Sequence, residues 1–222
     1  MKECLLCQQN IESIPKFFDI FLLRKEEKLI CLSCERKFTK LAERHCQSCC
    51  KELDDDKKVC QDCKNWLAIG HEVNHQALYK YDESMKEYFS TYKFMGHYNL
   101  RGVFASDLKK MLKQYRGFTL VPIPLAGKRL FERGFNQVSS ILDYAGIKYE
   151  DYLVKHDTKK QSSLSRFERL NHENPFELLA EVKDDKICII DDIYTSGATL
   201  YHAVALFKDA GVKEIKTVSL CR

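Results

Sequence analysis

Three apolar runs in the later part of the chain have the length and composition of β-strands. They cover residues 118–124, 186–190 and 215–221, and charged residues or glycine bound each of them. The first run ends in Pro-Ile-Pro, which marks the start of a loop. The second run is apolar on both faces, as is typical of a strand buried in a parallel sheet.

Segments with helical periodicity separate these runs. They cover residues 83–95, 99–115, 136–144 and 195–210. The second segment is amphipathic, because Phe104, Leu108 and Leu112 recur on one face. A glycine follows the first, third and fourth segments at the point where each helix should end. Strands and helices that alternate predict an α/β fold with a mostly parallel sheet flanked by helices.

The start of the chain differs from the rest in composition. It holds nine of the eleven cysteines within residues 1–63, and too few apolar residues for a core of its own. We therefore predict two domains, residues 1–66 and residues 67–222, with the boundary within residues 64–78. Bound metal would supply much of the folding free energy of the smaller domain.

Eight of these cysteines form four Cys-x-x-Cys knuckles, separated by 23, 11 and 10 residues. The knuckles consist of Cys4 and Cys7, Cys31 and Cys34, Cys46 and Cys49, and Cys60 and Cys63. One such pair is compatible with a thioredoxin-like redox centre or with free thiols, but four pairs in one short region favour zinc. Since each knuckle points two sulfur atoms at one ion, the eight ligands predict two structural four-cysteine zinc sites.

The spacing leaves the pairing of the knuckles open. Sequential pairing closes each site locally, and we favour it over an interleaved arrangement that joins the first knuckle to the third. Cys50 has no partner knuckle and is expected to be a bystander. Cys188 and Cys221 lie in predicted strands and are expected in the apolar core.

Composition excludes several classes of protein. Apolar residues make up 45% and charged residues 31% of the 222 residues, so neither a disordered nor a fibrous chain is expected. The formal net charge of +4 comes with no polyanion-binding tail. The sequence begins without an apolar signal region and holds no apolar stretch of membrane-spanning length, so we expect a cytoplasmic protein.

The run at residues 186–190 leads into a group suited to binding a phosphate monoester. Asp191 and Asp192 follow it directly, and a turn rich in hydroxyl residues and containing Gly197 leads on into a predicted helix. Parallel sheets bind ligands at the carboxyl ends of strands, and a helix N-terminus offers unpaired N–H groups to a phosphate. A simple helix cap would explain Thr195, but not two adjacent carboxylates.

Residues 187–200 resemble the phosphoribosyl-pyrophosphate (PRPP) signature of type I phosphoribosyltransferases. The resemblance implies that Asp191 and Asp192 contact the 2′ and 3′ hydroxyls of the ribose. It implies that the turn wraps the 5′-phosphate with Thr195, Ser196, Gly197, Ala198 and Thr199. Mg²⁺ would bind oxygens of PRPP rather than a protein cage. Ala198 departs from the pattern, since many members have a second glycine there.

Further motifs narrow the resemblance to the ComF family. They are the knuckle-rich start, Val-Pro-Ile-Pro-Leu at residues 121–125, Arg-Gly-Phe-Asn-Gln at residues 133–137, and residues 160–162 with residues 166–171. The resemblance covers essentially the whole chain. It implies a role in natural transformation, in which internalised single-stranded DNA is handled at the inner face of the cell membrane. The partners it implies are a ComFA-like helicase ATPase and recombination mediators.

Basic residues lie where the resemblance implies loops that bind pyrophosphate. Arg133, with Phe135 expected beneath it, is the strongest candidate, and Asp191 and Asp192 complete the predicted catalytic set. For each of these cations, including Arg133, a solvated surface role is the alternative. The further cations predicted to contact PRPP are Lys128, Arg129 and Lys160, the last in a polar stretch at residues 155–174 that we expect to be a loop.

A transferase also needs a pocket for the base that accepts the ribose. The sequence ends at Arg222 without a segment for the hood that usually selects the base. The zinc domain and the helices of residues 83–115 would have to replace that hood. The sequence therefore gives no support for transfer of the ribose phosphate to a base.

Residues 80–135 are a candidate surface for single-stranded DNA. They hold 11 Lys and Arg against 5 Asp and Glu. Aromatic side chains on a basic groove are typical of single-strand binding, although about two-thirds of those here should belong to the core. The aromatic residues of this segment include Tyr81, Tyr88, Phe89, Tyr92, Phe94, Tyr98, Tyr115, Phe118 and Phe131.

Three functions remain open on the sequence. The preferred one is a PRPP-binding and DNA-binding component of the transformation machinery. The second is an active phosphoribosyltransferase in nucleotide metabolism. The third is a zinc-stapled adaptor that docks the ComFA-like ATPase.

Overall fold

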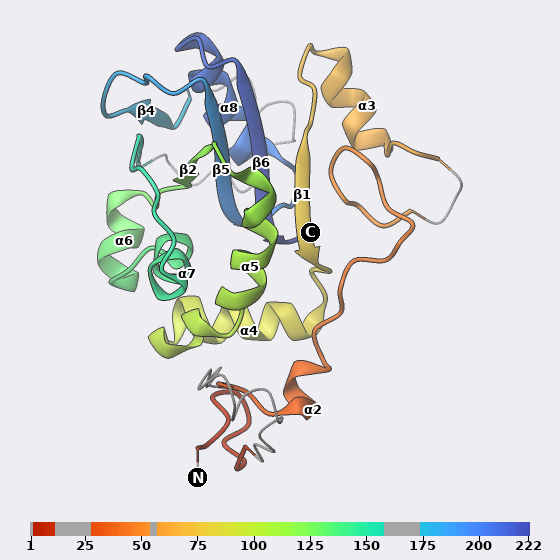
Figure 1. Cartoon of the computed structure of the whole chain (residues 1–222), viewed down its shortest axis with the longest axis vertical. Helices are drawn as coiled ribbons and strands as arrows, with labels where there is room; N and C mark the ends of the chain where they lie inside the picture. The colour runs from red at the N-terminus through yellow and green to blue at the C-terminus, as the bar shows by residue number, and fades with distance from the viewer. Residues whose placement is uncertain (1, 12–27, 54–56, 158–173) are drawn as a thin grey trace.

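The computed structural model describes residues 2–11, 28–53, 57–157 and 174–222 (Figure 1). Within these ranges no helix combines the length and the hydropathy that crossing a bilayer requires.

Four parallel strands form the central sheet, in the order β1–β6–β5–β2 (Figure 1). The strands are β1 (His75–Tyr79), β2 (Thr119–Pro122), β5 (Lys186–Ile193) and β6 (Glu214–Cys221). The three predicted strands are confirmed, and so is the parallel α/β fold. β1 was not predicted, because it is short and begins with polar residues. His75 of this strand is buried. Its imidazole nitrogens form hydrogen bonds with the hydroxyls of Thr217, at 3.0 Å, and Ser219, at 2.9 Å, so that no polar atom of the ring is left unsatisfied.

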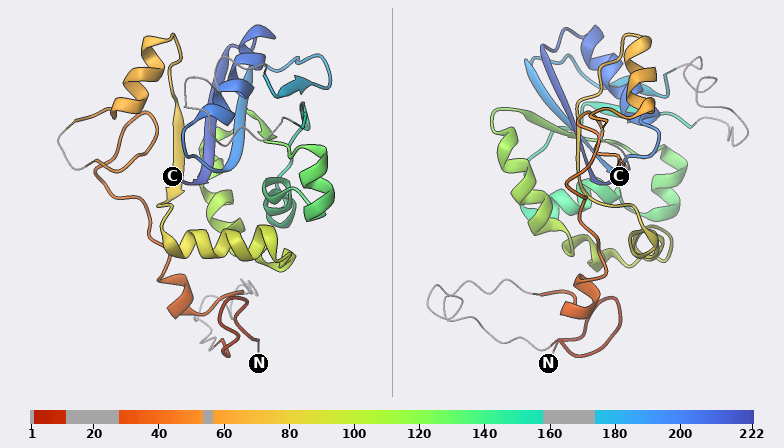
Figure 2. Two further views of the ribbon diagram at one scale, coloured as in Figure 1. Left: turned by 180° about the vertical axis from the view of Figure 1, so that it is seen from behind. Right: turned by 90° about the vertical axis from the view of Figure 1, so that its right-hand side faces the viewer.

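Helices cover both faces of the sheet (Figure 2). Because side chains alternate along a strand, Cys188 and Ile190 of β5 pack with α4 (Glu83–Phe94), α5 (Ala105–Leu112) and α7 (Gln137–Ala145). Ile187 and Ile189 pack on the other face with α8 (Ala198–Asp209). The burial of Cys188 and Cys221 in the core is confirmed.

The predicted helix of residues 99–115 is three shorter elements. A 3₁₀ turn, η1 (Tyr98–Gly102), precedes α5, and a second one, η2 (Lys113–Tyr115), follows it. Gly102 explains part of this division into three elements, since a Cβ on residue 102 would lie 2.4 Å from Leu29 and 2.6 Å from Tyr144. The chain needs a close approach at this point, and the regular helix starts only after it.

Two predicted boundaries near the acidic pair are wrong by a few residues. β5 does not end at residue 190 but continues to Ile193, so both carboxylates belong to the strand. The following helix starts at Ala198 rather than at residue 195, because Gly197 has a left-handed backbone with φ of 83° that breaks the helix. The pattern also missed α6 (Gly127–Arg133) and the antiparallel pair β3 (Leu153–Lys155) and β4 (Phe176–Leu178).

α4 lies across the end of the sheet at which β1, β5 and β6 terminate (Figure 1). It starts after β1 with the side chain of Asp82 accepting a hydrogen bond from the Met85 amide at 3.1 Å. The N-terminal segment and α2 (Leu32–Glu35) lie beyond α4, whereas α3 (Gln61–Ala68) lies beside β1 (Figures 1 and 2). α4 is therefore placed where a lid over the strand ends would lie.

The cysteines of the two regions relate differently to the core. Cys4 and Cys34 belong to a small apolar cluster of their own, whereas Cys46, Cys49, Cys60 and Cys63 share a cluster with the sheet and α8. The division into residues 1–66 and residues 67–222 stays a prediction.

Candidate functional site

Asp191 and Asp192 lie buried near the end of β5, with 9% and 7% of their surface exposed. Each carboxylate accepts a backbone N–H from the next residue, at 2.9 Å for Asp191 and 2.8 Å for Asp192. Burial and the charge of Asp192 raise the pKa of Asp191 to about 8. Burial also acts against ionisation of Asp192, but Lys93 outweighs it and lowers the pKa of that carboxyl. The pair thus consists of one neutral and one ionised acid at neutral pH.

The ammonium of Lys93 forms an ion pair with the Asp192 carboxylate. Lys93 comes from α4, its side chain is only 13% exposed, and its Nζ lies 4.3 Å from the centre of the Phe89 ring. Local sequence gives no signal for this contact, because a lysine on an amphipathic helix usually faces water. The lid helix is therefore tied to the acidic pair by a buried charge.

Two further cations face the acidic pair. Burial lowers the pKa of Lys155, and the charge of Asp191 counteracts that shift. Burial likewise lowers the pKa of Arg133, while the charge of Asp192 counteracts it. Lys155 ends β3 and bridges to Ala126, just before α6, which carries Arg133. The sequence singled out Arg133 but missed Lys155, whose only signal is its place at the start of a polar stretch.

The surroundings of Arg133 differ from the prediction. Its guanidinium donates to the side chain of Gln137, and its Cζ lies 5.7 Å from the Phe94 ring. Phe135, which was expected beneath Arg133, packs instead against Tyr92 in a tilted arrangement and against Tyr98 edge to face. The aromatic neighbour of Arg133 is thus an exposed residue of α4, since 78% of Phe94 is open to solvent.

The other predicted cations are less enclosed. Lys128 and Arg129 lie exposed on α6, where the Lys128 amide donates to Asp157 at 3.3 Å. Burial is the larger cause of the lowered pKa of Lys155 and of Arg133, and the positive charge of nearby Arg129 lowers both pKa values further. Lys160, and most of the predicted loop at residues 155–174, lie outside the described residues.

Residues 195–199, the phosphate loop, connect β5 to α8. A Cβ on Gly197 would lie 2.3 Å from the hydroxyl oxygen of Tyr194, so no larger residue fits without rearrangement. The hydroxyl of Ser196 accepts the Ala198 amide at 3.4 Å, while Gly197 is the N-cap residue of α8. Thr195 is exposed and lines a cavity of about 390 Å³. The loop therefore presents the N-terminus of α8 and exposed hydroxyls beside the acidic pair.

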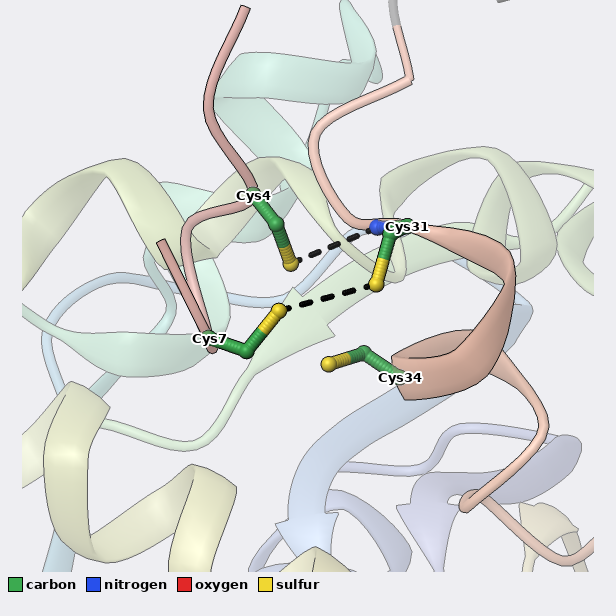
Figure 3. Close-up of side chains that lie close together, drawn as sticks. All are labelled: Cys4, Cys7, Cys31 and Cys34. Carbon is green, nitrogen blue, oxygen red and sulfur yellow. Dashed lines mark hydrogen bonds between the residues drawn. The ribbon is translucent and has the colours of Figure 1, made fainter. Parts of the chain in front are cut away.

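The first cluster consists of Cys4, Cys7, Cys31 and Cys34, whose sulfur atoms point toward a common centre (Figure 3). The Cys7 and Cys31 sulfurs are 3.6 Å apart, close to the roughly 3.8 Å between ligands of a tetrahedral zinc with 2.3 Å bonds. The Cys31 amide donates to the Cys4 sulfur at 3.3 Å. A hydrogen bond with Ser33 lowers the pKa of Cys31 to about 6, which favours the thiolate that a metal binds.

The second cluster consists of Cys46, Cys49, Cys60 and Cys63, and all four are buried. Cys46 and Cys63 have sulfurs 3.8 Å apart, and those of Cys49 and Cys60 are 3.6 Å apart, again the spacing of a tetrahedral site. A hydrogen bond with Cys63, assisted by the charge of Arg222, lowers the pKa of Cys49 to about 5. Both clusters thus fit structural zinc, and they pair the knuckles sequentially, as favoured from the spacing.

Cys50 lies outside both clusters, as expected for a bystander. It is buried, and its sulfur lies 3.5 Å from the carbonyl oxygen of His75. Burial raises the pKa of its thiol. The ninth cysteine of the N-terminal region is therefore a core residue.

The aromatic residues of the candidate DNA surface divide between core and solvent. Six are buried or partly buried, and they are Tyr81, Tyr88, Phe89, Tyr92, Tyr115 and Phe118. The other three are open to solvent, with exposed fractions of 78% for Phe94, 39% for Tyr98 and 91% for Phe131. The Arg101 guanidinium lies over the Tyr98 ring at 3.7 Å. Exposed aromatics and arginines thus occur together around the end of α4.

Comparisons with known proteins point to one family. The family model described as "Phosphoribosyl transferase domain" matches residues 107–222. Competence protein ComFC of Streptococcus pneumoniae is 42% identical over 221 residues, which cover 99% of this chain and 100% of that protein. Competence protein ComFC of Bacillus subtilis is 32% identical over 216 residues, which cover 94% of this chain and 89% of that protein.

A solved structure, that of a hypoxanthine phosphoribosyltransferase from Staphylococcus aureus, is a distant match. It is 17% identical, with a TM-score of 0.33 over 54% of this chain and 61% of that one. The superposition is too poor to add to the assignment.

Proposed function

Because this chain belongs to the ComFC competence proteins and its later half is a phosphoribosyl transferase domain, we propose that it binds PRPP and single-stranded DNA during DNA uptake. The observation that carries the PRPP half is the buried acidic pair of β5 directly ahead of the phosphate loop. In this proposal Asp191 and Asp192 accept hydrogen bonds from the ribose hydroxyls. Mg²⁺ enters with PRPP and is held by oxygens of the ligand.

The phosphate loop is the partner of the 5′-phosphate in this proposal. The N–H groups in the first turn of α8 after Ala198 and the hydroxyls of Thr195 and Thr199 are suitable donors to a dianion. Gly197 keeps the backbone free of a side chain at the closest approach. Arg133 and Lys155 interact with the charges of the acidic pair and Arg129 lies near both of them, so these cations are available to a diphosphate group.

Replacing both acids tests the PRPP site. We expect Asp191→Ala with Asp192→Ala to abolish PRPP binding measured by calorimetry with Mg²⁺. The change leaves Lys93 buried without its partner and should cost about 2–4 kcal/mol, so circular dichroism must first show that the variant is folded. The matched control is Asp184→Ala with Asp185→Ala, an adjacent acidic pair ahead of the same strand. PRPP affinity equal to that of the unchanged protein would refute the pocket.

The surface around Phe94, Tyr98 and Phe131 supports the DNA half of the proposal. Exposed rings offer stacking platforms to unpaired bases, and Arg101 and Arg133 lie within reach of two of these rings. Arg129 and Lys128 add positive charge from α6. This arrangement suits a single strand that passes across the end of α4 and over α6.

Truncating two of the rings tests the DNA surface. Phe94→Ala with Phe131→Ala should weaken binding of fluorescent oligo-dT by about tenfold or more, because each stacked base contributes roughly 1–3 kcal/mol. Leu67→Ala with Leu179→Ala is the control, since these side chains are also exposed, at 63% and 60%. Anisotropy titrations at several salt concentrations give both the affinity and its salt dependence. An equal loss of oligo-dT affinity in the two double variants would show that DNA does not bind to this face.

A second candidate function is transfer of the ribosyl phosphate, and the cations around the acidic pair favour it. A departing diphosphate needs stabilisation of its negative charge, which Arg133 and Lys155 are near enough to give. α4, tied to Asp192 through Lys93, would take the role of the element that selects the base. Pyrophosphate release with PRPP, Mg²⁺ and a panel of bases tests this function, and no release with any base would exclude transfer to those acceptors.

The partnership with a ComFA-like helicase ATPase is the remaining part of the proposal. The two zinc clusters are the candidate docking elements, because small zinc modules often bind proteins or nucleic acid. Pull-down with the purified ATPase should succeed with the unchanged chain and fail after Cys60→Ser with Cys63→Ser. Capture that survives this change, in protein shown to lack that zinc, would place the docking surface elsewhere.

A further inference from the structure

The second cluster and the phosphate loop are joined by two independent contacts. One contact passes through Trp66 of α3, and the other through Arg222, the residue that follows β6. Neither residue touches the acidic pair in any contact described above. Binding of the ribose therefore does not explain why Trp66 and Arg222 connect the second cluster to the phosphate loop.

Trp66 connects the metal ligands to the backbone of the loop. α3 begins after Cys60 and carries Cys63, so two of the four ligands fix the start of this helix. Trp66 is one turn further along and only 2% exposed, and its indole N–H donates to the carbonyl oxygen of Ser196 at 3.2 Å. Its ring stacks on Tyr201 of α8 with centroids 4.9 Å apart. The indole is thus held between the second cluster and the helix that the loop opens.

Arg222 makes the second connection. Its Nη1 donates to the Tyr194 carbonyl at 3.3 Å, and its Nη2 lies 3.8 Å from the Cys49 sulfur. The guanidinium also lies over the Tyr194 ring, with Cζ 4.9 Å from the centroid. A thiolate at Cys49 and the carbonyl just before the loop therefore share one charged donor.

Tyr194 connects the Arg222 contact to the backbone of the phosphate loop. Its hydroxyl lies directly below Gly197, where a Cβ would come within 2.3 Å of it, and its ring packs against His75 of β1 with centroids 4.2 Å apart. A shift of Tyr194 would therefore displace the left-handed turn at Gly197. The contacts of the first cluster, among the described residues, lead instead to Phe38 and Val103.

We propose that metal binding at the second cluster sets the conformation of the phosphate loop, and that Trp66 and Arg222 are the positioning residues that transmit it. The proposal rests on the proposed function, because it makes the affinity for a phosphate ester depend on zinc at one cluster and not at the other. Loss of that zinc frees α3 and the Cys49 sulfur, and the loop loses both of its outside supports.

The test uses the full zinc-loaded chain and three measurements. Trp66→Phe removes the indole donor but keeps an aromatic ring on Tyr201, and Arg222→Gln removes the charge. We expect amide hydrogen exchange in the peptide spanning the phosphate loop to accelerate in both variants without ligand. PRPP affinity, measured with Mg²⁺, should fall by about threefold to tenfold, as expected for one lost hydrogen bond. Zinc content, measured by mass spectrometry, should stay at the level of the unchanged protein.

A matched control separates positioning from general destabilisation. Tyr115→Phe also removes one hydrogen bond of a buried aromatic residue, to Gln76 at 3.0 Å, but Tyr115 packs in a different core cluster from Trp66 and Tyr194. It should leave loop exchange and PRPP affinity unchanged. Loop exchange in Trp66→Phe and Arg222→Gln no faster than in Tyr115→Phe would overturn the proposal.

Removing the metal gives the complementary result. Cys60→Ser with Cys63→Ser should raise loop exchange at least as much as Trp66→Phe, whereas Cys4→Ser with Cys7→Ser should leave it unchanged. If the former variant unfolds, the Trp66 and Arg222 variants decide the question. If the unchanged chain does not bind PRPP while loop exchange responds as expected, the coupling holds and the proposed ligand is wrong.

Discussion

A carboxylic acid that stays protonated near neutral pH makes the stability of this protein depend on pH. The pKa of Asp191 is raised to about 8 by burial and by the charge of Asp192, whereas an unfolded aspartate titrates near 4. Between about pH 4 and pH 8 the folded chain therefore holds a proton that the unfolded chain has released. Through this group, the free energy of unfolding falls as pH rises across that window.

We expect Asp191→Asn to remove this dependence. The variant should have a free energy of unfolding higher than that of the unchanged protein by about 5 kcal/mol at pH 8, and nearly equal to it at pH 4. Urea titrations at four pH values give the two slopes, and their difference isolates Asp191 from the other titrating groups. Parallel slopes would show that Asp191 is ionised in the fold well below pH 8.

For single residues, the sequence predicts those that belong to a local motif and misses those that other helices and strands bring to the site. Asp191, Asp192 and the phosphate loop are contiguous, so their chemistry is visible in the printed sequence. Lys93 and Lys155 lie in other elements, and only tertiary packing brings them to the acids. A single buried cation has no spacing that distinguishes it from the surface lysines around it.

Among the elements, the contact between α4 and β5 makes a prediction that an ordinary helix contact would not. Lys93 and Asp192 are nearly enclosed, with side chains 13% and 8% exposed, so removing one charge leaves the other buried and unpaired. Lys93→Met and Asp192→Asn should each destabilise the fold by about 2–4 kcal/mol. The double variant should lose less than the sum, with a coupling of about 1–3 kcal/mol.

The same helix provides the control for this cycle. Lys86 pairs with Glu83 at 3.0 Å, but the side chains are 53% and 88% exposed. Lys86→Met with Glu83→Gln should therefore give a coupling of about 0.5 kcal/mol or less in the same urea titrations. A coupling just as small for the inner pair would mean that α4 is not held to β5 by this charge.

Element boundaries were predictable where a local cap determines them. Asn136 accepts the amides of Val138 and Ser139 at the start of α7, and Gly146 ends that helix, as the pattern predicts. The broken helix of residues 99–115 was not predictable in this way, because the close approach at Gly102 depends on Leu29 and Tyr144. Strand β1 was missed because the hydroxyls that satisfy His75 come from β6.

At the scale of the whole molecule, the two clusters play different parts although both consist of two Cys-x-x-Cys knuckles. The knuckle motif predicts eight ligands and two sites, and both sites are present. It contains nothing about what the sites pack against. The second cluster shares its apolar surroundings with Trp66, the sheet and α8, whereas the first lies with a few residues beyond α4 (Figure 1).

This difference predicts unequal effects of metal loss on stability. Cys7 is exposed and Cys31 partly exposed, so a chelator should remove metal from the first cluster before the enclosed second one. Because the second cluster belongs to the main core, Cys60→Ser with Cys63→Ser should lower the melting temperature of the whole chain by about 10 °C or more. Cys4→Ser with Cys7→Ser should lower it by only about 3 °C or less, because few core contacts depend on the first cluster. Calorimetry with parallel zinc analysis measures both, and equal shifts would mean that the first cluster also supports the sheet.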